Sequence, residues 1–279
     1  MADRIDRWMT GDGTVRILAA TSTAMVAEAA RVAASTPPVT DALGRLLTGV
    51  ALLELAQSPV DRVQCAFEQG GSAGQLLADV WPGVQVRGRA ENPGAVDEPV
   101  VAASGELRIT RHGFRSGSVY QSQVPVEGAS IAAALQKFCL DSEQTVTLFS
   151  LAVALDDSGA VERAGGLLVQ ALPDCEREHL ERVTACLEQA SFSDLVRAGE
   201  EPAAAACALF DRIELHVLGA DPLFYRCRCS LARAVGAVRT LSEAELDEVR
   251  GGRVEEVSCD FCGSVYRVGA AELAAEEDG

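Results

Sequence analysis

The sequence has little positive charge and no long apolar run. Lys and Arg number 24 against 41 Asp and Glu, which gives a formal net charge of −17. A surface of this sign repels phosphate backbones and anionic lipid, because both are bound mainly through Lys and Arg. The first residues, MADRIDRWMTGDG, contain no signal-peptide core, and no apolar run approaches the ~18 residues of a membrane span. The composition therefore argues against nucleic-acid or membrane partners and predicts a cytoplasmic protein.

Histidine is also scarce, which limits the catalytic sites that the chain can build. His112, His179 and His216 are scattered, and no Ser/His/Asp or paired-carboxylate constellation accompanies them. The glycine-rich stretch 68–74, EQGGSAG, lacks the Lys-Ser/Thr of a phosphate loop and predicts a tight turn. We therefore expect that the protein is not an enzyme.

Cysteine, in contrast, is abundant. In a reducing cytosol the nine cysteines are not expected to form structural disulfides, so they serve as buried apolar residues, metal ligands or redox-active thiols. Four of them form two closely spaced pairs, Cys227-x-Cys229 and Cys259-x-x-Cys262. The others stand alone and are expected as small buried residues: Cys65, Cys139, Cys175, Cys186 and Cys207.

Residues 1–173 carry the pattern of a mixed domain. The stretch 37–57 has Leu and Val at helical intervals after the candidate N-cap Thr40, and the Ala-rich stretch 22–35 predicts another helix. From residue 61 to about 173 the apolar period changes to two, with turns rich in Gly, Asp, Asn and Ser and one helix near 128–144. The fold class is therefore α+β, with a mixed α/β core domain.

Residues 174–222 differ in character from the residues before them. They begin with charged, Ala-rich helices whose apolar stripes are short, as in Leu180, Val183 and Leu187. Such helices depend on docking to another part of the protein. A strand follows, predicted to place Ile213, Leu215 and Val217 on one side.

Residues 223–279 form a small module with well-marked local signals. Ser230 is placed to cap a helix, Ser242 and Glu245 form a capping box, and Gly251 ends the second helix. Cys259 and Cys262 then lie in a turn before VYRV. A segment of this size has little core of its own, which indicates that metal holds it together.

The two cysteine pairs supply four soft sulfur ligands. Tetrahedral Zn(II) prefers such a set, whereas calcium and magnesium do not. Cys227, Cys229, Cys259 and Cys262 are therefore the predicted zinc ligands. Four thiolates close the coordination shell, so the site is structural or redox-active rather than hydrolytic.

The spacing also permits redox use of the site. Each pair is close enough in sequence to form its own disulfide, Cys227–Cys229 and Cys259–Cys262. An oxidant could thereby convert four ligands into two disulfides and expel zinc. Removing the metal would then unfold the module, to which metal binding contributes on the order of 10 kcal/mol.

These motifs resemble those of the heat shock protein 33 family of redox-regulated holdase chaperones. The resemblance rests on the Cys-x-Cys-Ser preceded by Tyr225 and on CDFCG near the C-terminus. Four core stretches resemble that family in the same order: LGRLLTGVALL, RGRA, SEQ and AGGLLVQALP. The resemblance covers nearly the whole chain.

The resemblance implies a chaperone that is inactive while reduced and zinc-bound. Oxidation of the four cysteines would release zinc, unfold the 223–279 switch module and destabilise a metastable, mainly helical linker at 174–222. The protein would change from monomer to homodimer, expose apolar surface and hold unfolded or partly unfolded client proteins without ATP during oxidative stress.

Two features depart from the family pattern, and one alternative stays open. The stretch LARAVGAV after the first cysteine pair is apolar where the family tends toward charge, and Cys139, Cys175, Cys186 and Cys207 are candidates for disulfide exchange with the switch. The alternative is an α+β domain with a static zinc ribbon that serves as a protein-interaction module. A nucleic-acid role for that ribbon is disfavoured because acidic residues outnumber its arginines.

Overall fold

The computed structural model describes residues 2–57, 61–102, 104–113, 117–128 and 130–275. It divides the chain into two compact units, residues 1–226 and 227–279. The mixed helix and strand content confirms the α+β class. Among the described residues, no helix combines the length and the apolarity needed to cross a bilayer. The last four residues of the predicted module, 276–279, lie outside the described residues.

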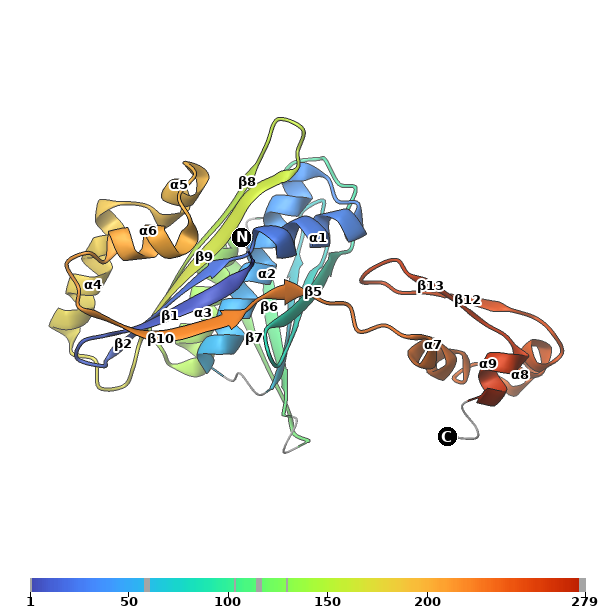
Figure 1. The fold of residues 1–279 in the computed structure, drawn as a ribbon. Coiled ribbons are helices and arrows are strands. Elements are labelled where there is room, and N and C mark those ends of the chain that lie inside the picture. Colours follow the sequence, from blue (N-terminus) through green and yellow to red (C-terminus); the bar gives the residue numbers. More distant parts are fainter. Residues whose placement is uncertain (1, 58–60, 103, 114–116, 129, 276–279) are drawn as a thin grey trace. The chain divides into compact units, whose positions relative to one another are not determined.

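The large unit contains two sheets whose strand pairs are antiparallel except for one (Figure 1). Sheet A has the strand order β10-β1-β2-β9-β8. Its strands are β1 (Arg4–Thr10), β2 (Val15–Thr21), β8 (Thr147–Leu155), β9 (Val161–Ala171) and β10 (Leu215–Pro222). Sheet B has the order β11-β5-β4-β3-β6-β7, in which the short β11 pairs parallel to β5. Its strands are β3 (Arg62–Gln69), β4 (Leu76–Trp81), β5 (Gln85–Ala90), β6 (Ser104–His112), β7 (Val119–Glu127) and β11 (Phe224–Tyr225).

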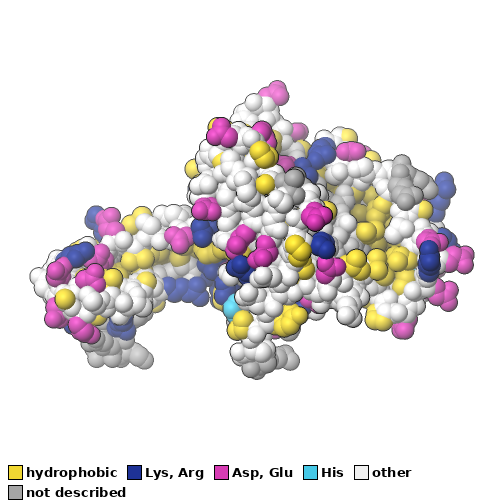
Figure 2. All heavy atoms as spheres, turned by 180° about the vertical axis from the view of Figure 1, so that it is seen from behind, with side chains coloured by type: hydrophobic (Ala, Val, Ile, Leu, Met, Phe, Trp, Pro, Cys, Tyr) yellow, Lys and Arg dark blue, Asp and Glu magenta, His cyan; other side chains and the backbone are white. Residues whose placement is uncertain are grey.

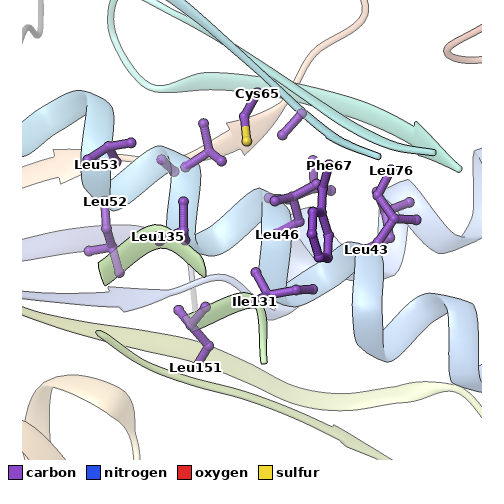
Figure 3. Close-up of a cluster of buried hydrophobic side chains, with 14 of the residues drawn as sticks. Leu43, Leu46, Leu52, Leu53, Cys65, Phe67, Leu76, Ile131, Leu135 and Leu151 are labelled. Carbon is purple, nitrogen blue, oxygen red and sulfur yellow. The ribbon is translucent and has the colours of Figure 1, made fainter. Parts of the chain in front are cut away.

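The helix α2 (Pro37–Gln57) forms the centre of the main core. It packs against β3, β4 and β5 of sheet B and against β2, β8 and β9 of sheet A. Most of its residues are buried, which explains why its sequence is apolar on nearly every side. Figure 3 shows Cys65, Phe67 and Leu76 on one side of this helix and Ile131 and Leu151 on the other. The helices α1 (Thr23–Ala33) and α3 (Ile131–Glu143) pack beside α2.

A second core lies on the opposite face of sheet A. Three helices contribute to it, α4 (Arg177–Gln189), α5 (Phe192–Arg197) and α6 (Pro202–Leu209). Phe192 of α5 and Val183 of α4 are fully buried there, beside Trp8 and Ile17 of sheet A. The segment predicted as a linker, 174–222, therefore comprises these helices and the edge strand β10, and it belongs to the same compact unit as residues 1–173.

The small unit contains three helices and a hairpin among its described residues. The helices are α7 (Leu231–Val238), α8 (Glu243–Arg250) and α9 (Ala270–Ala275), and the hairpin pairs β12 (Glu255–Ser258) with β13 (Val265–Val268). The predicted capping box of Ser242 and Glu245 and the helix end at Gly251 are confirmed.

One sequence prediction about the large unit is wrong in detail. The helix α2 begins at Pro37 rather than after Thr40, because proline fits the first turn of a helix and the Thr36 carbonyl accepts from the Thr40 N–H. Leu215 and Val217 pair with Thr10 and Trp8 in an unbroken register, so they lie on one side of β10 as predicted. Val217 is 75% exposed on this edge strand.

Candidate metal centre

The small unit brings all four cysteines of the two motifs together. Their sulfur atoms all lie within 4.8 Å of one another. Cys227 Sγ lies 3.6 Å from Cys259 Sγ, and Cys229 Sγ lies 3.4 Å from Cys262 Sγ. A zinc–sulfur distance of about 2.3 Å gives tetrahedral S–S separations of about 3.8 Å, so both the donor set and its spacing fit zinc.

Cys227 and Cys229 lie on the segment that enters α7. The hydroxyl of Ser230 accepts from the Arg233 N–H and fixes the start of that helix directly after Cys229. The extended chain therefore ends directly after Cys229. Cys227 and Cys229 alternate along this extended chain, so both side chains face the same site.

Cys259 and Cys262 lie in the tight turn that joins β12 to β13. The Cys259 N–H donates to the Ser264 carbonyl at 2.9 Å, and the Gly263 N–H donates to the Cys259 carbonyl at 2.8 Å. Gly263 has φ +68°, a conformation that favours glycine. The turn thus brings the two thiols together.

Two hydroxyl groups contact the sulfur atoms of Cys229 and Cys262. The Tyr266 hydroxyl donates to Cys229 Sγ at 3.0 Å, and Ser264 Oγ lies 3.2 Å from Cys262 Sγ. Both residues belong to the turn and strand that follow Cys262. Neither residue was predicted from the sequence. The available signal was an alternating strand directly after the second cysteine pair, which turns every other side chain toward the site.

The thiols differ in acidity when metal is absent. Burial raises the pKa of Cys227 to about 12 and also raises that of Cys259. Burial acts on Cys262 in the same direction, but hydrogen bonds from the Ser264 hydroxyl and N–H, together with hydrogen bonds from the Cys229 and Cys227 thiols, outweigh it and lower the Cys262 pKa to about 7. Because a bound cation favours thiolates, metal binding would displace the protons that the other sulfurs retain.

The small unit has little apolar core beyond the sulfur cluster. Val235, Val238 and Ala234 of α7 supply much of it, which accounts for the apolar stretch LARAVGAV. The other buried members are Leu246, Val249, Val268 and Leu273. A core of this size contributes little to the folding stability of the small unit, so metal binding contributes a large part of that stability.

The other cysteines have different surroundings. Cys65 and Cys139 are buried as predicted, and burial raises the pKa of both thiols. Cys175 and Cys186 are partly buried against the second core. Cys207 is exposed, so the prediction that it is buried is wrong, since α6 turns it away from sheet A.

The histidines belong to the large unit, whereas the sulfur cluster belongs to the small unit. His179 Nδ1 is 3.4 Å from an Asp12 carboxylate oxygen, and His216 is exposed on the edge strand β10. Among the described residues, the cluster of possible metal ligands consists of the four cysteines.

Fold and site together define a class: an α+β protein with a small second unit organised around four thiols. A family model described as Hsp33 protein matches residues 3–269. The 33 kDa chaperonin of a Thermus thermophilus strain is 34% identical over 97% of this chain and 85% of its own length. The 33 kDa chaperonin of Symbiobacterium thermophilum is 33% identical over 100% of this chain and 98% of its own. The crystal structure of the 33 kDa chaperonin from Thermotoga maritima matches over the full length of both chains with TM-score 0.87 and 25% identity.

The chain belongs to the Hsp33 family. This membership supports a chaperone function, and the relatives are named as chaperonins rather than as an enzyme family.

Proposed function

We propose that this protein is a redox-regulated, ATP-independent holdase chaperone. Cys227, Cys229, Cys259 and Cys262 hold Zn(II) in the reduced, inactive form. The observation that carries the proposal is the meeting of four thiols in a unit with very little apolar core. When bound, zinc supplies positive charge and a fixed tetrahedral geometry.

Oxidation removes the ligands in pairs. Each disulfide forms from two thiols that give up two electrons to a peroxide, whose oxygens leave as water. Two peroxides therefore convert the four cysteines into two disulfides and leave no thiolate for the metal. The low pKa of Cys262, set by Ser264, favours this residue as the first nucleophile once its metal bond is broken.

The proposed disulfides join neighbours in sequence, Cys227 to Cys229 and Cys259 to Cys262. The shortest sulfur contacts instead run between the motifs, from Cys227 to Cys259 and from Cys229 to Cys262. Peptide mapping of the oxidised protein distinguishes these pairings, and a crosswise product would replace the proposed one.

Unfolding of the small unit would act on the large unit through the chain itself. Cys227 directly follows a segment that forms the edge of both sheets, since β10 pairs with β1 and β11 pairs with β5. The Arg226 N–H donates to the Val86 carbonyl at 2.8 Å. Loss of order after Cys227 would therefore leave these edge contacts as the last ones that hold this end of the segment 174–226.

The helices at the other end of that segment cover apolar surface incompletely. A cavity of about 240 Å³ lies between sheet A and α4–α5, lined among others by Leu148, Leu167, Leu187 and Phe192. Figure 2 shows hydrophobic side chains in a hollow beside the part of the large unit that carries these helices. Incomplete cover buries less apolar surface than close packing does, so these helices are suited to be the metastable linker.

The remaining parts of the proposal concern location and assembly. The protein acts in the cytoplasm as a monomer when reduced and as a homodimer when oxidised. Its partners are unfolded or partly unfolded proteins, and neither nucleic acid nor membrane is a partner of so acidic a chain.

Light scattering tests this function directly. A chemically unfolded client is diluted into the zinc-loaded, reduced protein and into peroxide-treated protein, while a chromogenic chelator measures released zinc. We expect only the oxidised form to suppress aggregation, with zinc released as activity appears. If zinc stays bound, or if neither form protects the client, the static zinc ribbon becomes the better account.

A further inference from the structure

The strand β8 has an unpaired edge. It is the last strand of sheet A, and only β9 pairs with it among the described strands. The Phe149 N–H points away from β9, because it donates to the Gln136 side chain at 3.0 Å. Since the outward direction alternates along an antiparallel strand, the N–H and C=O groups of Leu151 and Val153 also point outward.

Part of this edge has no partner within the described chain. The Leu151 carbonyl accepts from Arg45 Nη1 at 3.3 Å, but neither its N–H nor the backbone groups of Val153 pair with a described residue. Leu151 and Val153 are nevertheless at most 5% exposed. Unpaired backbone groups beside buried side chains present a template for another strand.

An apolar groove runs beside the same residues. Its volume is about 850 Å³, and Leu151, Val153 and Leu155 of β8 form part of its lining. The opposite walls come from the start of α2, the start of α3 and the loop 98–101, with Ala42, Ile131 and Val100 among the apolar side chains. Ile131 and Leu151 lie on the same side of α2 in Figure 3. A strand placed about 4.8 Å from β8 would direct alternate side chains into this groove.

The charged side chains at the groove favour a basic occupant. Asp41, Arg45 and Glu98 are the charged residues of the lining. Arg45 Nε and Nη2 both donate to the Asp41 carboxylate at 2.8 Å, so these two charges compensate each other. Glu98 is then the uncompensated charge, in a chain that carries −17 overall.

We propose that the β8 groove, defined by these lining residues, binds extended peptide segments by strand addition. The occupant has apolar side chains at alternate positions and basic residues at its ends. Backbone hydrogen bonds to Leu151 and Val153 supply affinity without regard to sequence, and the groove selects the alternate apolar side chains. The inference rests on the proposed function at one point only, where it identifies the bound peptide segment as part of an unfolded client.

The position of the groove has a consequence for regulation. All its lining residues belong to the large unit and to elements other than the segment 174–226. The groove is therefore present in the reduced form as well as in the oxidised form. Peptide binding there is independent of redox state, whereas retention of a large client depends on the additional surface that oxidation exposes.

Fluorescence anisotropy of a labelled peptide tests the proposal with the full-length protein. The probe is a short peptide with Val at alternate positions, Thr between them and Arg at both ends. A second peptide carries N-methyl groups on the backbone edge that would pair with β8, and a third has Glu at both ends. We expect the first to bind reduced and oxidised protein with affinities within about threefold, and the other two to bind at least about tenfold more weakly.

Two neighbouring substitutions locate the binding site. Ala132→Arg places a long, positive side chain in the groove, whereas Ala133→Arg adds the same charge at an exposed position on the same helix that does not line it. We expect Ala132→Arg to weaken binding of the first peptide at least about tenfold and Ala133→Arg to leave it unchanged. Circular dichroism of both variants verifies that they fold.

The outcomes separate this proposal from the proposed function. Equal peptide binding by the folded Ala132→Arg variant overturns the groove, even if oxidation still activates the holdase. Binding restricted to the oxidised form also overturns it. A dimer of the reduced protein that Ala132→Arg dissociates would show that a second copy occupies the groove, which contradicts the peptide as its occupant. Failure of the wild-type protein to suppress aggregation overturns the holdase function and leaves the peptide result standing.

Discussion

The two units of the chain are stabilised in different ways. In the large unit, α2 is buried between two sheets, and apolar side chains from every layer meet around it. In the small unit, the described residues include an apolar core of seven buried side chains and a cluster of four thiols. Apolar burial depends weakly on the redox state of the cell, whereas coordination by thiolates ends when the thiols are oxidised. The comparison shows how a single chain can combine a permanent scaffold with a removable part.

The same contrast recurs within the large unit, between the two faces of sheet A. The face toward α2 is filled by a long buried helix. The other face is covered by shorter helices that leave a cavity of about 240 Å³. These shorter helices belong to the segment 174–222, which leads to the cysteines. The less tightly packed part of the large unit is therefore the part proposed to unfold after the small unit.

Removal of the metal should have the largest effect. We expect Cys259→Ser to abolish tight zinc binding and to unfold residues 227–275, a loss on the order of 10 kcal/mol for this unit, while the α2 core stays folded. Zinc content and amide NMR spectra measure both outcomes. Cys207→Ser, at an exposed cysteine outside the cluster, is the control and should change neither. A small unit that stays folded without metal would remove the contrast between the units.

Weakening the cover of sheet A should mimic part of the switch. Phe192 is 1% exposed in the second core, so Phe192→Ala should cost about 3–5 kcal/mol and detach α4–α6 from the sheet. We expect partial suppression of client aggregation by the reduced variant with zinc still bound. The control is Tyr120→Ala on the exposed face of β7. An inactive Phe192→Ala protein whose helices are protease-sensitive would show that this face does not hold clients.

A buried acid in the large unit makes the stability of that unit depend on pH. Glu54 of α2 is 1% exposed, and neither carboxylate oxygen has a hydrogen-bond partner among the described residues. Burial, with smaller contributions from Asp221 and Asp61, raises its pKa from 4.5 to about 8. Below pH 4.5 the group is protonated in both states. As the pH rises from 4.5 to 8, only the unfolded chain releases the proton, so stability falls until the folded pKa is passed.

Glu54→Gln should remove this dependence. We expect a gain on the order of 3 kcal/mol at pH 7 and little change at pH 4. Urea unfolding of the large unit at several pH values measures it, with the exposed Glu162→Gln as control. Parallel stability curves for Glu54→Gln and wild type would contradict the raised pKa.

The hydroxyl contact to the sulfur cluster should have the smallest effect. Tyr266→Phe removes the hydrogen bond to Cys229 Sγ and keeps the ring. A hydrogen bond to a charged group contributes about 1.5–3 kcal/mol, so zinc affinity should fall by about 10- to 100-fold. Competition with a chromogenic chelator measures the affinity, and Tyr120→Phe serves as control. An unchanged affinity would mean that the contact does not stabilise the thiolate.

Much of the fold follows from local patterns in the sequence. The helices within 22–35, 37–57 and 128–144 and the strand pattern from 61 to about 173 were predicted, because each has a clear apolar period. The strands β1 and β2 were missed, although the turn Gly11-Asp12-Gly13 between them is a hairpin signal, because their charged residues obscured the alternation.

The candidate site was likewise predicted in part and missed in part. The four cysteines were predicted as one cluster because the spacing of thiol ligands is a strong signal, and the structure places them together. Tyr266 and Ser264 were missed because their contact with sulfur depends on how the turn after Cys259 folds. The groove beside β8 was missed because it is formed by parts of the chain as far apart as Pro37 and Leu155.

Hydrogen exchange on the reduced, zinc-bound protein and on the peroxide-treated protein tests the central claim most directly. We predict that oxidation removes protection from residues 227–275 and from helices α4–α6, while α2 and the strands β3–β6 keep theirs. If the small unit loses zinc and protection while α4–α6 stay as protected as before, the segment 174–222 is not a linker that responds to the switch, and the account is contradicted.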